Sequence, residues 1–285
     1  MNKIWIEYLN RFARTPKLSK PKMTKAFKKL EVGIKNDVLG EIENQLQNKL
    51  PVKFFTQLSL DEYFFKLPYI FNIEVFCLRL YKAKVDNHKI CIYSDYDTDA
   101  VTATATMYWG LIELGFDPAN LSFYAPDRFT EGYGMNVEAV ADLALQNDLV
   151  ISVDCGINSV AEAVGIQNLK KNKLSKCDLI ITDHHHLVNS IPDCTAVLNP
   201  RLAEYYRQNS MEVEPSKKII RSLFDSIEEE TLQKFEAWVE KVYRSSEKVI
   251  SNPDDYLSES VTGVGVAWFC LVWLGYFLEE IEVNI

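Results

Sequence analysis

The sequence lacks the cysteine spacing of a disulfide framework. Six cysteines are spread over 285 residues without a CxxC pair, and several lie in apolar runs where a reduced thiol packs as a small hydrophobic group. The N-terminal stretch also lacks an apolar segment long enough for a signal peptide, which argues against secretion. Both absences predict a reducing, cytoplasmic setting.

The longest apolar run lacks the basic flanks of a membrane span. Residues 261–278 carry no charge, and their length is near the lower limit for a transmembrane helix. Glu259 precedes the run and acidic residues follow it, whereas Thr262 and Gly263 are typical of a helix entrance. We therefore predict a buried core helix and no membrane association. A transmembrane helix is the alternative.

Positive charge is scarce overall but concentrated at one end. The chain has 31 Lys and Arg against 40 Asp and Glu, a formal net charge of -9. Residues 1–30 nevertheless carry nine basic side chains and one acid, Glu7. A basic arm on an acidic protein is suited to holding a polyanion, so we predict a basic helical arm over 1–53. A solvated helical face is the alternative explanation for the same charges.

From residue 89 onward, short β-branched runs alternate with helical segments. Strands are predicted at 89–95, 121–125, 148–154, 177–183 and 195–199. Helices are predicted between the first four strands, with Asn136 and Asn158 placed to cap two of them. This alternation implies right-handed crossovers. The predicted fold class is α/β, a parallel β-sheet flanked by helices.

Acidic side chains gather where these strands end. Three carboxylates follow the first strand at alternate positions, and like charges this close are costly unless a cation or fixed donors neutralise them. Because ligands collect beyond the carboxyl ends of parallel strands, distant parts of the chain should converge on one cluster. Its members are Asp95, Asp97 and Asp99 after the first strand, Asp154 after the third, and Asp183 with His184, His185 and His186 after the fourth.

The types of side chain in this cluster indicate its chemistry. Carboxylates with some imidazole suit a hard or borderline divalent ion such as Mn²⁺ or Mg²⁺ better than structural zinc. The donors exceed the needs of one ion, so we predict two ions sharing a carboxylate. Such a pair generates a hydroxide and clamps a phosphoryl oxygen. The predicted reaction is hydrolysis of a phosphate ester or anhydride.

Three other interpretations of these motifs explain less. The stretch "DYDTDA" resembles the start of a calcium loop, but Ala100 replaces the required glycine and Thr106 the required glutamate. In a haloacid-dehalogenase site, Asp95 would be a nucleophile, but that leaves Asp154 and the three histidines unexplained. A polar loop with incidental histidines is the remaining alternative, in a chain with only four histidines.

Five ordered motifs, "SDYDTDAVTAT", "TEGYGMN", "SVDCGINS", "TDHHH" and "VLNPR", resemble those of the DHH phosphoesterases. Within that family they are most similar to the RecJ-type exonucleases, which degrade single-stranded DNA from the 5′ end. The segment "TGVGVAWF" also resembles a later part of that group. The resemblance implies a phosphoesterase core over 54–200.

The resemblance also implies roles for individual residues. Asp97 would bind the first ion, Asp99 and His184 the second, and Asp154 both. His185 would lie beside the scissile phosphate, with Asp95 as a ligand or a nearby acid. The implied substrate-binding residues are Arg128, Gly132 and Gly134, and a surface turn with a solvated Arg128 is the alternative. The implied partner is single-stranded nucleic acid, DNA more than RNA.

The chain also departs from this pattern. Tyr93 stands where many relatives have histidine, which would weaken the first metal site. We predict an inserted helical segment over 201–260, where Phe235 lies in an apolar stripe. After the core helix in 261–285, the sequence does not include the second domain and the further aspartate of RecJ-type chains. Three explanations stay open: the sequence is a fragment, a second chain or domain supplies the lid, or the activity is reduced. Alternative functions are hydrolysis of short oligonucleotides or cyclic dinucleotides, and a non-catalytic scaffold in replication.

Overall fold

The computed structural model describes residues 69–127, 134–203, 205, 233–235, 237–238 and 260–282, which belong to the compact unit Leu67–Ile285. The predicted basic arm, most of the inserted segment, Arg128 and Gly132 lie outside the described residues. The predictions for them therefore stay predictions.

A five-stranded sheet forms the centre of the fold, in the order β2-β1-β3-β4-β5 with all neighbours parallel. The strands are β1 (Ile90–Ser94), β2 (Leu121–Tyr124), β3 (Leu149–Val153), β4 (Asp178–Thr182) and β5 (Ala196–Leu198). Each is shorter than predicted by one or two residues. The predicted fold class is confirmed.

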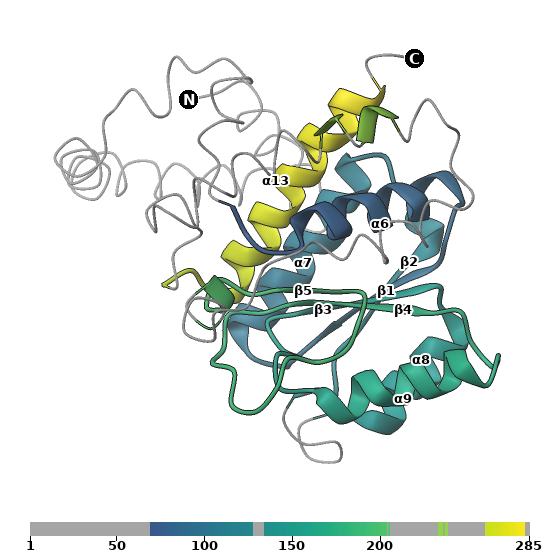
Figure 1. The fold of residues 1–285 in the computed structure, drawn as a ribbon, viewed down its shortest axis with the longest axis vertical. Coiled ribbons are helices and arrows are strands. Elements are labelled where there is room, and N and C mark those ends of the chain that lie inside the picture. The colour runs from purple at the N-terminus through teal and green to yellow at the C-terminus, as the bar shows by residue number, and fades with distance from the viewer. Residues whose placement is uncertain are drawn as a thin grey trace, which may run out of the picture. The chain divides into compact units, whose positions relative to one another are not determined.

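Helices cover both faces of this sheet (Figure 1). One face carries α6 (Ile73–Val85), α7 (Thr98–Glu113) and α13 (Gly263–Glu282), and the other carries α8 (Val137–Gln146) and α9 (Val160–Lys171). A 3-10 turn, η2 (Pro118–Asn120), leads into β2. Because β1 and β3 are covered on both sides, all of their residues are buried.

Side-chain caps explain where two of the helices begin. The carboxylate of Asp97 accepts a hydrogen bond from the backbone N–H of Ala100 and starts α7. Asn136 accepts from two backbone N–H groups of α8, as predicted. The prediction for Asn158 is wrong. Residue Ser159 precedes α9, while the Asn158 amide donates to the His186 carbonyl, because the loop after β4 offers it polar partners.

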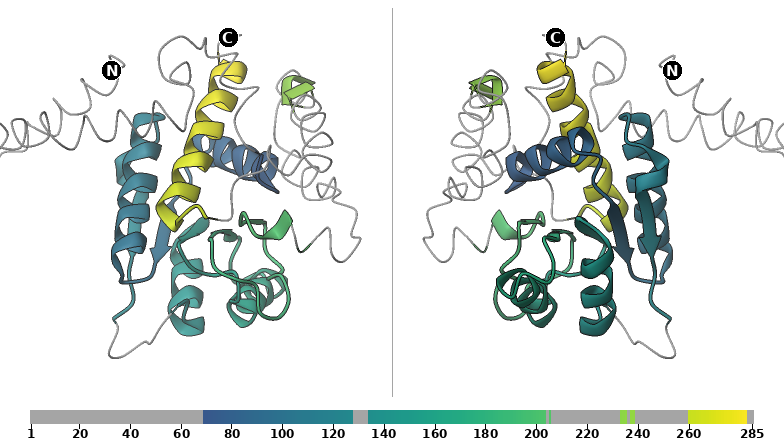
Figure 2. Two further views of the ribbon diagram at one scale, coloured as in Figure 1. Left: turned by 90° about the vertical axis from the view of Figure 1, so that its left-hand side faces the viewer. Right: turned by 90° about the vertical axis from the view of Figure 1, so that its right-hand side faces the viewer.

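Most of the apolar run at 261–278 lies within the helix α13. It packs along α7 and against α6 (Figure 2), and a Cβ on Gly110 of α7 would overlap the side chain of Leu271. Among the described residues, the stretch Gly263–Ile281 is long and apolar enough to cross a membrane by length and composition, and 50% of its apolar window is buried inside the fold.

Two described residues of the segment 201–260 pack on the C-terminal half of α13. Phe235 and Trp238 are each 1% exposed. Their rings lie 5.8 Å and 4.8 Å from the ring of Phe277, and Trp238 lies 6.3 Å from Trp273. The burial of Phe235 agrees with the apolar stripe predicted for this segment. Phe235 and Trp238 therefore cover apolar surface of α13.

A buried arginine joins α6 to the opposite, amino edge of the sheet. The Arg79 guanidinium is 2% exposed, and it donates to Asp178 at 2.6 Å and to the carbonyl of Asp148 at 2.8 Å. Lys170 pairs with the other oxygen of Asp178 at 2.6 Å. Burial acts to raise the pKa of Asp178, but the charges of Arg79 and Lys170 outweigh it and leave that pKa below its ordinary value.

Arg79→Ala should therefore destabilise the fold strongly. The change leaves Asp178 and a carbonyl poorly compensated in the interior, which costs about 3–5 kcal/mol of unfolding free energy. Lys170→Ala is the matched control, because its side chain is 35% exposed and a pair of that kind contributes at most about 1 kcal/mol. Urea unfolding measures both, and equal losses in the two variants would contradict the argument.

Candidate functional site

Three acids converge at the carboxyl edge of the sheet, as predicted. Asp95 follows β1, Asp154 follows β3 and Asp183 follows β4. These strands are direct neighbours in the order β1-β3-β4, and each of the three acids is at most 2% exposed. The topology therefore brings together carboxylates that are up to 88 residues apart in the sequence.

Asp154 occupies the centre of the site in an unusual backbone conformation. Its φ is 59°, in the left-handed region that aspartate tolerates better than most residues, and its N–H donates to the carbonyl of Thr182 at 2.9 Å. Its Oδ1 atom lies 3.1 Å from Nε2 of His184, yet that oxygen is buried without a hydrogen-bond partner. A buried carboxylate oxygen in this state is suited to binding a cation.

The pKa of Asp154 reflects this environment. Burial is the main cause that raises it, from the ordinary value of 3.8 to about 7, and the charges of Asp99 and Asp97 raise it further. The charge of His185 acts in the opposite direction. Without a cation, the charged form of Asp154 is therefore disfavoured at this position.

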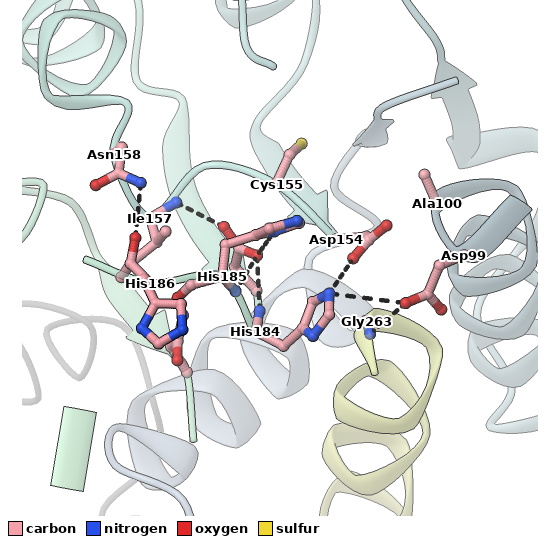
Figure 3. A network of polar contacts seen from close by, with 12 residues as sticks. Asp99, Ala100, Asp154, Cys155, Ile157, Asn158, His184, His185, His186 and Gly263 are labelled. Atoms are coloured by element: carbon pink, nitrogen blue, oxygen red, sulfur yellow. Dashed lines mark hydrogen bonds and ion pairs between the residues drawn. The ribbon is translucent and has the colours of Figure 1, made fainter. Parts of the chain in front are cut away.

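Asp99 joins the strand-end acids to a helix from the far end of the chain. Its two carboxylate oxygens accept hydrogen bonds from the backbone N–H groups of Gly263 at 2.8 Å and Val264 at 3.0 Å, in the first turn of α13. The same Asp99 oxygen that binds Gly263 lies 3.7 Å from Nε2 of His184 (Figure 3). Asp99, Asp154 and His184 thus form one contiguous group.

Asp183 fixes the loop that carries the histidines. Its Oδ1 atom accepts from the backbone N–H groups of His184 and His185 and lies 2.7 Å from Nδ1 of His185, while Oδ2 accepts from the N–H of Ile157 at 2.8 Å. Burial acts to raise the pKa of Asp183, but the hydrogen bond from the His185 ring and those from the backbone outweigh it and lower that pKa.

The pKa values of His184 and His185 are shifted in opposite directions. The hydrogen bond to Asp183 raises the pKa of His185 above its ordinary value, although burial opposes it. Burial, followed by the charge of His185, lowers the pKa of His184. Their rings lie 4.5 Å apart. Neutral His184 is therefore the better metal ligand, and His185 the better proton carrier.

Two residues after β5 donate hydrogen bonds to the backbone of the loop that carries the histidines. The amide of Asn199 donates to the carbonyl of His185 at 3.0 Å, and Nε of Arg201 donates to the carbonyl of His184 at 2.8 Å. Together with Asn158, which binds the carbonyl of His186, these contacts fix the backbone of all three histidines. The "NPR" motif thus has a structural explanation.

The remaining predicted ligands lie at the start of α7. Asp95 is 1% exposed, and its Oδ1 accepts from the N–H of Tyr96 at 2.8 Å. Asp97 is exposed and caps α7. The charge of Asp97 contributes to the pKa shifts of Asp154 and His185.

Gly134 is the one predicted substrate-binding residue that the structure describes. It has a φ of 83°, which favours glycine, and its carbonyl accepts from the hydroxyl of Tyr93 at 3.2 Å. The same hydroxyl accepts from the N–H of Asn136. Tyr93 thus anchors the loop before α8 to β1.

The donor set fits a divalent cation. One ligand atom from each of Asp154, His184 and His185 lies within 4.8 Å of the others, and Asp99 adjoins this group. Mixed carboxylate and imidazole donors suit Mn²⁺ and Mg²⁺. Sequence reasoning missed the contributions of Gly263 and Val264 and the positioning role of Asp183. The glycines of "TGVGVA" and the acid preceding the histidines were the available signals.

Comparison with known proteins agrees with these motifs. The profile described as the DHH family, N-terminal domain, matches residues 89–233. The single-stranded-DNA-specific exonuclease RecJ of Bacillus subtilis (strain 168) is 41% identical over 124 residues, which are 43% of this chain and 15% of that protein. RecJ of Salmonella typhimurium (strain LT2) is 35% identical over 126 residues, 44% of this chain and 20% of that protein.

The matched region spans about a fifth or less of the length of these relatives. A crystal structure of exonuclease RecJ bound to manganese has a TM-score of 0.48 and 23% sequence identity, and the match covers 80% of this chain and 40% of that one.

Proposed function

The chain belongs to the DHH family, and we propose that it is a divalent-metal-dependent phosphodiesterase that uses two Mn²⁺ or Mg²⁺ ions. The observation that carries the proposal is the buried Oδ1 of Asp154, which accepts no hydrogen bond and lies 3.1 Å from Nε2 of His184. A non-catalytic scaffold gains nothing from an uncompensated acid in its interior, whereas a metal site requires one.

The proposed ligands follow the geometry and the family pattern together. Asp154 would bind both ions, Asp99 and His184 would bind the second, and Asp97 would bind the first. Asp95 is a further ligand or orients the others. Asp99 already accepts two hydrogen bonds, but a carboxylate has about four lone-pair sites, so it retains capacity for an ion.

The chain's own residues supply the proton chemistry. Bound ions would supply an activated water and neutralise the charge of a phosphoryl group. His185 is held by Asp183 through Nδ1, so Nε2 is the atom that we assign to the scissile phosphate. In its protonated form, which Asp183 favours, His185 donates a proton to the leaving oxygen.

The proposed substrate is single-stranded DNA, degraded from the 5′ end. The relatives of Bacillus subtilis and Salmonella typhimurium are named as single-stranded-DNA-specific exonucleases, and the basic arm predicted over 1–53 is suited to holding a strand through its phosphates. The six cysteines are unpaired, which supports a reducing, cytoplasmic setting. Short oligonucleotides or cyclic dinucleotides are the alternative substrates, and a separate chain or domain that closes over the strand remains part of the proposal.

A nuclease assay with two histidine variants tests the proposal. In Mn²⁺ we expect wild type to release nucleotides from the 5′ end of a labelled single strand, and to lose this activity in EDTA. His185→Ala should reduce the rate by about 10²- to 10⁴-fold, because a general acid is lost. His186→Ala is the matched control, since no role is assigned to that ring, and it should retain the wild-type rate.

Other outcomes separate the alternatives. Cleavage of a dinucleotide or a cyclic dinucleotide, without cleavage of the long strand, would favour the small substrates. Mn²⁺ binding measured by calorimetry, without hydrolysis of any substrate, would contradict the proposed enzymatic activity and favour the non-catalytic scaffold.

A further inference from the structure

We propose that the first turn of α13 positions Asp99 and Asp154 for metal binding, so that docking of this helix and occupation of the metal site are coupled. The inference rests on the proposed function. It assigns a role to Gly263 and Val264, which lie 164 and 165 residues from the acid that they bind.

The first element of the argument is the pair of hydrogen bonds on Asp99. Gly263 and Val264 are the first two residues of α13, and their N–H groups have no acceptor within the helix. Each binds a different oxygen of Asp99, so the carboxylate is held at both ends and its rotation is restricted. With a single hydrogen bond the carboxylate group could still rotate.

The second element is the close approach of Gly263 to Asp154. A Cβ built on Gly263 would overlap with the Cβ, Cγ and Oδ1 atoms of Asp154. Only glycine therefore allows the start of α13 to touch Asp99 while Asp154 keeps its present position. The helix start contacts one acid through hydrogen bonds and the other through packing.

The third element is electrostatic. Asp99 and Asp154 both approach Nε2 of His184, at 3.7 Å and 3.1 Å, so two carboxylates of like charge lie close together. The N-terminus of a helix carries partial positive charge, which partly offsets this repulsion before a cation binds. The helix start therefore keeps the two carboxylates close enough to share one ion.

Two proline variants test this role. Val264→Pro removes one N–H donor to Asp99 at a position where a helix tolerates proline. Glu138→Pro is the matched control, because it removes the equivalent donor in the first turn of α8, whose acceptor is Asn136. By calorimetry we expect Mn²⁺ to bind about 10- to 100-fold more weakly to Val264→Pro. Glu138→Pro should stay within about twofold of wild type.

A second pair tests the close approach. Gly263→Ala should weaken Mn²⁺ binding, whereas Gly275→Ala in the same helix should not, because its Cβ would meet only the end of the Leu114 side chain at 3.4 Å. Melting in EDTA identifies any variant that fails to fold. Wild type provides a test without substitution, since Mn²⁺ should slow hydrogen exchange in the first turn of α13.

The outcomes separate the inference from the function on which it rests. If wild type binds Mn²⁺, and Val264→Pro and Gly263→Ala bind it as tightly as their controls, the inference is wrong and the proposed function stands. Faster exchange at the start of α13 on adding Mn²⁺ would also overturn it. If wild type binds no Mn²⁺ by calorimetry, the proposed metal site fails and the inference fails with it.

Discussion

Asp154→Asn is expected to abolish Mn²⁺-dependent hydrolysis and, in the same protein, to raise its thermal stability without metal. The lost activity follows from the proposed bridging role, since a neutral amide does not replace a carboxylate shared by two cations. Stabilisation of the transition state by such ions contributes several kcal/mol, so the rate should fall by about 10³-fold or more.

The gain in stability follows from the pKa of the same side chain. In the unfolded chain Asp154 ionises near its ordinary value of 3.8, and in the folded metal-free protein near 7. Below both values it is protonated in both states and has no effect. Between them the unfolded chain gives up its proton first, so the free energy of unfolding falls as pH rises. Above about pH 7 Asp154 is charged in both states, and the penalty lowers the free energy of unfolding by up to about 4 kcal/mol.

Asparagine is the substitution that isolates this effect. It removes the charge, keeps the size of the side chain, and tolerates the φ of 59° at this position, whereas alanine would add backbone strain. At pH 8 the melting temperature of Asp154→Asn should be higher than that of wild type in EDTA and lower than that of wild type in Mn²⁺. Asp142→Asn, at an exposed position on α8, should follow wild type in both.

One result would refute the prediction for Asp154. If wild type and Asp154→Asn have the same melting temperature in EDTA at both pH 4 and pH 8, the buried carboxylate carries no penalty. The argument that it requires a cation would then lose its support.

Local sequence patterns predicted the scaffold of the site well. Strands such as 148–154 are nearly continuous apolar runs, and the acid that follows each run must lie at the carboxyl edge of a parallel sheet. The approximate position of Asp154 beside Asp95 and Asp183 follows from that rule and from the order of the strands. The fold class and the convergence of these acids could therefore be predicted before any coordinates.

Contacts between distant segments could not be predicted in this way. The hydrogen bonds from Gly263 and Val264 to Asp99 depend on how α13 packs along α7, which is set by side-chain fit at places such as Gly110 and Leu271. No periodicity in the sequence encodes that fit. The sequence predicted the N-terminus of a helix near Gly263, but it did not predict the contact of that N-terminus with Asp99.

Asn158 shows how a local helix cap and contacts with a distant segment compete for the same side chain. Asparagine before a helical segment is a common cap, which is the basis of the wrong prediction. In the folded protein its amide and carbonyl instead bind the carbonyl of His186 and the N–H of Val188, in the loop after β4. Tertiary partners 28 and 30 residues away outweighed the local one.

Asp183→Asn should reduce the rate by about 10²- to 10⁴-fold and shift the alkaline limb of the pH–rate profile to lower pH. Asp183 accepts from Nδ1 of His185, and this hydrogen bond is the main cause of the raised pKa of that histidine. With a neutral acceptor the pKa of His185 falls. Because the protonated ring is the proposed proton donor, activity is then lost at a lower pH than in wild type.

A purely structural role for Asp183 predicts a different result, so the two must be separated. The carboxylate accepts four hydrogen bonds, including those from the backbone of Ile157 and His184. An amide leaves at least one buried donor without a partner, which costs about 1–3 kcal/mol of unfolding free energy. The pKa of Asp183 is lowered, so wild type also loses this stabilisation as pH falls below about 4, and the variant should not.

His185→Gln provides the control, because it removes the proton donor but keeps Asp183 and its backbone hydrogen bonds. It should match Asp183→Asn in lost activity while melting closer to wild type, and its profile should lack the alkaline limb altogether. The pH–rate profile is the decisive measurement, since weakened folding lowers the rate without moving a limb. If Asp183→Asn lowers the rate but keeps the wild-type profile, Asp183 supports only the loop, and the proton must come from a group other than His185.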